Sequence, residues 1–322
     1  MSRSKKIDSG LNFLEEISDI DISECYQRDF SKFPISTVSR DRVVGLLDLT
    51  SLENTDTLLS IENLYLKGFN PNHFYKNLLQ YSVDESNQIE ISTNTHVAGI
   101  CSFSNNLDLA LSRRDELLSS VKNAPKIVSV GGFFPYGKAS IKAKLYEINE
   151  IISKNIDEID IVLDQGLVNS REYSVLFDEI TQISNLLKSA ERKIILKVIL
   201  ESGEINDKRI LAEVAYISLY AGADFLKTST GKLPKMANLN DFSLMALIAA
   251  RFKEINSTTV GLKVSGGVKD IVTASHYIEI YEKNLLETAD SSNFRIGSSS
   301  LLDNIFNQIN VDVESNYPPI IY

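Results

Sequence analysis

The chain has 322 residues, of which 43% are hydrophobic and 24% are charged. These are ordinary values for globular proteins, so disordered, collagen-like and fibrous classes are excluded. Thirty-three Lys and Arg against 43 Asp and Glu give a net charge of −10, which argues for solubility and against general attraction to nucleic acid or acidic membranes. The length allows one large domain or two smaller ones.

The sequence shows no sign of export, of a membrane anchor or of a metal site. Acidic residues precede any apolar run near the N-terminus, unlike a signal peptide, and the apolar runs fall short of the ~20 residues that span a bilayer. The two cysteines, Cys25 and Cys101, are too few for a disulfide framework. The three histidines are not spaced as metal ligands usually are; they are His73, His96 and His276. We therefore expect a cytoplasmic protein without a bound metal.

From about residue 42 onward, short runs rich in β-branched residues alternate with longer amphipathic segments, which is the pattern of βα units in a parallel sheet. Two helices are expected in the long first connection, over 56–66 and 72–81, and N-caps at Ser170 and at Asn240 or Asp241 would start two later helices. We predict strands over 43–49, 97–103, 126–133, 158–164, 193–200, 223–229, 260–266 and 294–299.

Eight such units predict an α/β fold of the (β/α)8 or TIM barrel type, for which about 250 residues is typical. An open doubly wound sheet is the alternative, but the G-x-G-x-x-G turn that often follows its first strand is absent. We therefore expect an N-terminal helical extension over residues 1–41, one barrel over 42–309 and a C-terminal tail over 310–322.

The fifth, sixth and seventh predicted strands each carry a lysine among apolar residues, namely Lys197, Lys227 and Lys263. A single strand lysine usually extends to solvent, but both faces of a parallel barrel strand are covered. Residues two apart share a strand face, so Asp160 and Asp164 would join these lysines near the mouth where barrel enzymes place their chemistry. Neighbouring ammonium groups and burial disfavour a charged lysine, so one amine should be partly neutral and nucleophilic, as Schiff-base chemistry requires.

Small residues follow the last three predicted strands. Gly231 and Lys232 follow the sixth strand and Gly266 and Gly267 the seventh, while residues 297–299 (Gly-Ser-Ser) end the eighth. Loops after strands seven and eight of barrels commonly bind phosphate through backbone amides, because glycine lets the chain approach the anion closely. An ordinary turn is the alternative for any single pair, but clusters after both strands favour a phosphate site.

Several segments occur in the order of one known family: LLDLTSLENTDT, VAGICSF, SVGGFFPYGKASIKAKLYEI, DEIDIV, ILKVILESGE, ADFLKTSTGK, GLKVSGG and FRIGSSSLL. They resemble the 2-deoxy-D-ribose-5-phosphate aldolases, which are class I aldolases, over about residues 42–302. The resemblance implies a lyase without metal or organic cofactor. It would reversibly cleave 2-deoxy-D-ribose 5-phosphate to D-glyceraldehyde 3-phosphate and acetaldehyde through a Schiff base.

The resemblance also implies roles for individual residues. Lys227 would form the imine, Lys263 would lower the pKa of Lys227 and help relay protons, and Asp160 would be the acid/base partner. The implied substrate pocket contains Asp48, Cys101 and Lys197. The implied phosphate site contains Gly231, Lys232, Gly266, Gly267, Gly297, Ser298, Ser299 and Ser300.

The expected partners are a phosphorylated sugar and aldehydes, with neither nucleic acid nor membrane. The assembly state stays open, with a homodimer as one option. Another Schiff-base aldolase of a phosphorylated sugar and a non-catalytic phosphosugar-binding barrel are the alternative functions. The first alternative keeps the Lys227 imine, whereas the second does not need it.

Overall fold

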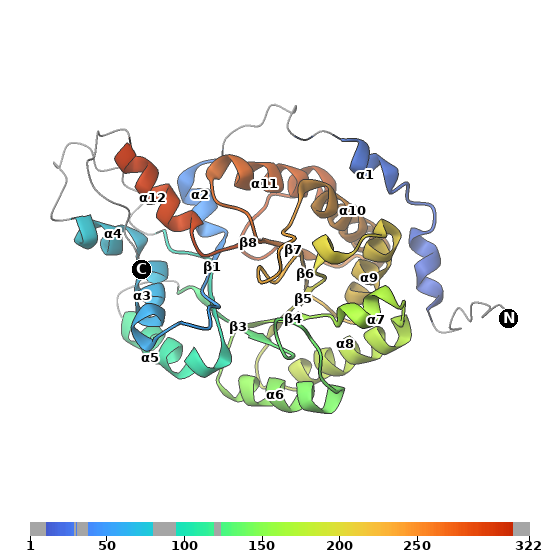
Figure 1. The fold of residues 1–322 in the computed structure, drawn as a ribbon, viewed down its shortest axis with the longest axis horizontal. Coiled ribbons are helices and arrows are strands. Elements are labelled where there is room, and N and C mark those ends of the chain that lie inside the picture. The colour runs from blue at the N-terminus through green and yellow to red at the C-terminus, as the bar shows by residue number, and fades with distance from the viewer. Residues whose placement is uncertain (1–10, 29, 31–37, 80–94, 119–123, 312–322) are drawn as a thin grey trace.

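The structure, a computed structural model, describes residues 11–28, 30, 38–79, 95–118 and 124–311. Eight parallel strands pair in chain order, and β8 closes on β1 (Figure 1). The predicted TIM barrel is thus confirmed, and the open sheet is excluded. The strands are β1 (Leu47–Thr50), β2 (Gly99–Ser102), β3 (Lys126–Gly131), β4 (Glu158–Val162), β5 (Ile195–Ile199), β6 (Phe225–Lys227), β7 (Gly261–Ser265) and β8 (Phe294–Ser298).

Helices surround the barrel (Figure 1). They are α3 (Leu58–Phe69), α4 (Pro71–Leu79), α5 (Leu107–Leu118), α6 (Ile141–Ser153), α7 (Gln165–Asn169), α8 (Tyr173–Lys188), α9 (Lys208–Tyr220), α10 (Leu239–Asn256), α11 (Ile271–Leu285) and α12 (Leu301–Val311). The short turns η4 (Ser104–Asn106) and η5 (Ser202–Glu204) follow β2 and β5. Side-chain oxygens of Ser140, Asp207 and Asp270 accept hydrogen bonds from free amides at the starts of α6, α9 and α11. None of the described helices is both long and apolar enough to span a bilayer.

Several boundaries differ from the sequence prediction, and for three of them the local helix caps show where the element begins or ends. The first strand begins at Leu47 rather than at residue 43, because Ser39 caps a short helix, α2 (Arg40–Gly45), that takes up the start of the apolar run. Ser170 ends α7 instead of capping α8, which begins at Tyr173. Helix α10 is capped by Asn238, two residues before the earlier of the predicted caps.

The described part of the N-terminal extension packs on the outside of the helix ring. It contains η1 (Asn12–Ile17), α1 (Ser23–Gln27) and the first residues of α2, and α1 lies beside α10 (Figure 1). Phe13 stacks on Tyr220 of α9 with ring centroids 4.2 Å apart, and Ile17 is completely buried. Residues 1–10 and 312–322, which include most of the predicted tail, lie outside the described part of the chain.

Alternate residues of each strand face opposite sides of the barrel wall. In β4, Ile159 and Ile161 belong to the apolar core between the strands and the helices. Glu158 and Asp160 point the other way and are also buried. The barrel interior therefore receives charged side chains, while the apolar layer outside the strands supplies the burial that holds the fold together.

Candidate active site

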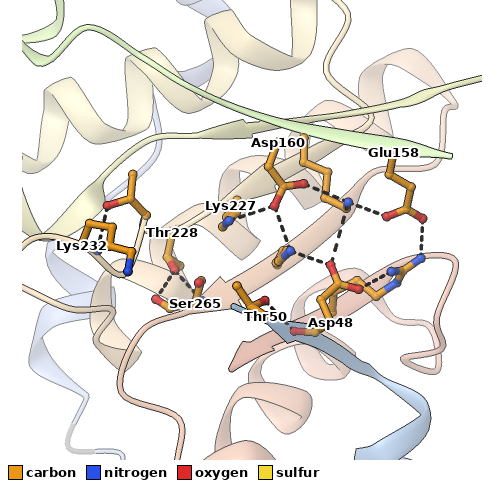
Figure 2. A network of polar contacts seen from close by, with 12 residues as sticks. Asp48, Thr50, Glu158, Asp160, Lys227, Thr228, Lys232 and Ser265 are labelled. Atoms are coloured by element: carbon orange, nitrogen blue, oxygen red, sulfur yellow. Dashed lines mark hydrogen bonds and ion pairs between the residues drawn. The ribbon is translucent and has the colours of Figure 1, made fainter. Parts of the chain in front are cut away.

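A cluster of charged side chains fills the interior of the barrel (Figure 2). All of its members are at most 3% exposed. They are the carboxylates of Asp48, Glu158 and Asp160 and the basic groups of Lys197, Lys227, Lys263 and Arg295. Four bases against three carboxylates leave an excess of one positive charge if every group is ionised. Since an uncompensated charge is costly to bury, the cluster is best balanced when one of its amines is neutral.

Asp160 is the centre of this cluster, because it accepts hydrogen bonds from three lysines on three consecutive strands. Its Oδ1 lies 3.0 Å from the Nζ of Lys197, and its Oδ2 lies 2.8 Å from the Nζ of both Lys227 and Lys263. Burial alone would raise the pKa of Asp160, but the three ammonium groups hold it well below its usual range. Asp160 is therefore ionised at neutral pH.

The three lysines differ in how many carboxylates they contact. Lys197 pairs with Glu158, with Asp160 and, at 3.9 Å, with Asp48. Lys263 contacts Asp48 at 2.6 Å and Asp160 at 2.8 Å. Among the described residues, Lys227 pairs with Asp160 alone.

This difference separates the pKa values of the lysines. Burial disfavours the charged form of each amine, but the surrounding carboxylates outweigh it for Lys197 and Lys263 and raise their pKa. For Lys227, burial dominates over the attraction of Asp160, the charge of Lys263 adds to the effect, and the pKa is lowered. Lys227 is therefore the amine that most readily loses its proton, as the sequence suggested for one of the three.

Arg295 and Glu158 belong to the cluster although the sequence analysis did not select them. The guanidinium of Arg295 donates to Asp48 and, at 2.6 Å, to Glu158. Burial would raise the pKa of Asp48, but the positive charges of Arg295 and the nearby lysines outweigh it and lower the pKa. Strand alternation would have indicated Glu158, which shares a face with Asp160, and Arg295, which shares one with Gly297.

Two glycines make room for this cluster. A Cβ on Gly99 of β2 would lie 2.7 Å from Asp48 Oδ1. A Cβ on Gly297 of β8 would lie 3.1 Å from the Cε of Lys263. Gly297, which the resemblance assigned to the phosphate site, thus lies against the stem of Lys263 within the strand.

Asp164 and Cys101 do not join the ion pairs. Strand β4 ends at Val162, so alternation no longer orients Asp164, whose carboxylate instead caps α7 and accepts from Lys138 at 2.8 Å. Cys101 lies in a small apolar cluster of the interior with Val128. Burial raises the pKa of its thiol to about 11, so the thiol is protonated at neutral pH.

The loops after β6, β7 and β8 lie at the C-terminal mouth. Gly231, Gly266 and Gly267 all have positive φ, between 76° and 86°, which other residues adopt only with strain. A Cβ on Gly266 would lie 3.8 Å from the Cα of Gly231, so the first two loops approach each other closely. Thr228 joins β6 to β7, since its Oγ1 accepts from the Ser265 amide at 2.9 Å (Figure 2).

The loop after β8 connects to the loop after β7 through Ser298. Its hydroxyl donates to the carbonyl of Val268 at 3.0 Å and accepts from the Leu301 amide at 3.1 Å. Ser299 and Ser300 follow at the entrance to α12. Lys232 is not part of the interior cluster, because its Nζ pairs with Glu53 in the loop after β1. Apart from Gly297, the residues predicted to hold phosphate thus lie at the ends of β6, β7 and β8 or just after them, at one end of the barrel.

The described residues contain no group of three or more His, Cys, Asp or Glu side chains arranged to hold a metal ion. What the arrangement offers chemically is a buried amine with a lowered pKa, one carboxylate that it can exchange a proton with, and a second lysine that is held charged. These are the groups that a Schiff-base reaction requires.

Comparison with known proteins gives similar sequences and similar solved structures. No protein-family model matches the chain. A protein from Caenorhabditis elegans named "Putative deoxyribose-phosphate aldolase" is 29% identical over 264 residues, which cover 81% of this chain and 78% of that protein. Similar solved structures include a putative deoxyribose-phosphate aldolase from Coccidioides immitis (TM-score 0.63, 21% identity, 93% of this chain and 98% of that one). Another is the deoxyribose phosphate aldolase from Aeropyrum pernix (TM-score 0.60, 20% identity, 91% and 100%). In sequence the chain is thus similar to a protein named as a putative deoxyribose-phosphate aldolase, a lyase, and in fold it is similar to solved structures of that name.

Proposed function

We propose that the protein is a class I aldolase that reversibly cleaves 2-deoxy-D-ribose 5-phosphate to D-glyceraldehyde 3-phosphate and acetaldehyde. The observation that carries this proposal is the contrast among the three buried lysines. Lys227 pairs with one carboxylate and has a lowered pKa, whereas Lys263 pairs with two and has a raised pKa. A barrel that only bound a phosphosugar would have no need of a buried amine that readily loses its proton.

In the proposed reaction, the neutral amine of Lys227 attacks C1 of the open-chain sugar, and the adduct takes up a proton and loses water to give a protonated imine. Removal of the proton from the C3 hydroxyl breaks the C2–C3 bond, and its electron pair moves to the imine nitrogen as an enamine forms. Glyceraldehyde 3-phosphate leaves at this point. Protonation of the enamine at C2 and return of the water release acetaldehyde and the free lysine.

Asp160 and Lys263 are placed to move the protons of this sequence. Asp160 accepts the hydrogen bond of the Lys227 amine at 2.8 Å, so its carboxylate can receive the proton that the amine sheds and pass it on through a water. Lys263 shares the same carboxylate oxygen and stabilises the negative charge of Asp160 between transfers. Asp48, Lys197 and Cys101 then shape the interior around the reacting atoms.

The phosphate of the substrate would bind at the mouth, where the glycine loops after β6 and β7 and the serines before α12 would supply backbone amides. The substrate is therefore a small phosphorylated sugar, with aldehydes as products. Neither nucleic acid nor a membrane takes part. Both cysteines are free and buried, which suits a reducing compartment such as the cytoplasm.

The test is release of glyceraldehyde 3-phosphate from 2-deoxy-D-ribose 5-phosphate, measured in the presence of a chelator. We expect the wild type to be active and Lys227→Ala to be inactive. Lys144→Ala is the matched control, because Lys144 is another buried lysine, paired with Glu179 in the outer helices. An inactive wild type, or activity that survives Lys227→Ala, would refute the proposal.

Trapping with acetaldehyde and borohydride, followed by peptide mass mapping, tests the imine itself. The expected adduct is on Lys227. An adduct on Lys227 without cleavage of deoxyribose 5-phosphate would point to a Schiff-base aldolase with another substrate.

A further inference from the structure

An ion pair at the mouth of the barrel occupies the lysine that is expected to bind phosphate. The Nζ of Lys232 lies 2.7 Å from Oε1 of Glu53, although the two residues are 179 positions apart in the chain. Lys232 follows β6 and Glu53 follows β1. In the closed barrel β7 and β8 stand between these strands, so the pair connects loops on either side of those that carry Gly266, Gly267 and Ser299.

The neighbours of both residues fix where their loops lie. The Glu53 amide donates to Asp56 Oδ2 at 3.0 Å, and the same carboxylate accepts from the Ser51 hydroxyl at 2.8 and 2.9 Å. On the other side, the Lys232 amide donates to Thr230 Oγ1 at 3.1 Å. The Thr230 hydroxyl in turn donates to the buried carboxylate of Glu201 at 2.6 Å. The contact therefore joins two loops that are each held in place by their own hydrogen bonds.

The carboxylate of Glu53, which is paired with Lys232, competes with a phosphate for the same ammonium group. A phosphate that binds Lys232 either displaces Glu53 or lies close to its negative charge, and both cost binding energy. An uncharged hydroxymethyl group at the same end of a sugar has no such cost. The pair is only partly shielded, since the Glu53 side chain is 65% exposed and that of Lys232 is 24% exposed. The effect should therefore be modest.

We propose that Glu53 is a specificity-determining residue that weakens binding of phosphorylated substrates relative to unphosphorylated ones by neutralising Lys232. The proposal rests on the proposed function of the site. Exposed ion pairs of this kind change affinities by about two- to fivefold. The protein would thus discriminate less strongly between phosphorylated and unphosphorylated sugars than a site with a free Lys232 would.

The experiment compares the wild type with Glu53→Gln, which keeps the shape of the side chain and removes its charge. Binding of inorganic phosphate is measured by calorimetry, and KM is measured for 2-deoxyribose 5-phosphate and for 2-deoxyribose. We expect Glu53→Gln to bind phosphate about two- to fivefold more tightly. It should lower KM for the phosphorylated sugar by a similar factor and leave KM for 2-deoxyribose unchanged.

Glu204→Gln is the matched control. Glu204 is a neighbouring acidic residue that pairs with Lys235 at 3.6 Å rather than with Lys232, so its replacement changes the net charge equally and should leave phosphate binding unchanged. Unchanged or weaker phosphate binding by Glu53→Gln would overturn the inference, as would an equal gain in Glu204→Gln. If the wild type cleaves neither sugar, the proposed function fails, but the phosphate titration still decides the role of Glu53.

Discussion

Replacing Lys263 by Met tests whether the charge of Lys263 is what makes Lys227 reactive. Met keeps an unbranched side chain of similar length and removes the ammonium group. Both ammonium nitrogens lie 2.8 Å from the same oxygen of Asp160, so they are at most about 5.6 Å apart. At an effective dielectric constant of about 20, two unit charges at that distance repel by about 3 kcal/mol.

Losing this repulsion raises the pKa of Lys227, because the charge of Lys263 is one of the causes that lower it. Lys227 would also have less competition for Asp160, which acts in the same direction. A free energy of about 3 kcal/mol corresponds to roughly 100-fold in the protonation equilibrium. We therefore expect adduct formation between Lys227 and acetaldehyde to slow by up to about 100-fold at neutral pH, and the loss to shrink as the pH is raised.

The assay is the rate of irreversible labelling by acetaldehyde and borohydride at pH values from about 6 to 10, in wild type and Lys263→Met. Lys144→Met is the control for burial, because it removes an equally buried lysine from the outer helices and should leave the pH profile of labelling unchanged. Circular dichroism establishes that each variant is folded. The reasoning is refuted if the profile of folded Lys263→Met is unchanged or moves to lower pH.

Two further predictions concern the stability that the charged cluster contributes. Arg295→Met leaves Asp48 and Glu158 buried with fewer partners, so the free energy of unfolding, measured in urea, should fall by about 3–5 kcal/mol. The control is Arg171→Met, which breaks an exposed pair with Asp207 and should lower the free energy of unfolding by less than about 1 kcal/mol. The folded-state pKa values of Asp48 and Asp160 are lowered, so their stabilisation is present above the unfolded pKa of about 3.9 and is lost as the pH falls through the folded values. The free energy of unfolding of the wild type, measured in urea, should fall below about pH 4 by up to about 2.7 kcal/mol per pH unit from these two groups. A free energy of unfolding that stays constant from pH 5 to pH 3 would contradict this.

The barrel could be predicted from the sequence because short apolar runs, most of them with β-branched residues, alternate with amphipathic segments eight times. Strand alternation also placed Lys197, Lys227 and Lys263 on one side with Asp160, as the structure has them. Alternation failed for Asp164, because the chain leaves the strand at Val162 and turns into α7. It holds only where the backbone is extended.

Other features depend on contacts between distant segments and could not be predicted. The ranking of the lysines follows from how many carboxylates each one reaches, which side-chain positions decide. The pair between Glu53 and Lys232 joins two loops that are adjacent only after the barrel has closed. The start of the first strand was misplaced because the run VVGLLDL is apolar from residue 43 up to Asp48, and the cap at Ser39 determines where its helical part begins.

The charged cluster is itself an argument for chemistry in the barrel interior. Apolar side chains of similar volume in place of buried ion pairs are often equally or more stabilising, and barrel interiors are normally filled by branched apolar residues. Here β1, β4, β5, β6, β7 and β8 all contribute a buried charged side chain instead. The ion pairs that keep Lys197 and Lys263 protonated use all three carboxylates and leave Lys227 a share in only one. The same contacts that satisfy the other buried charges therefore make Lys227 the amine that gives up its proton.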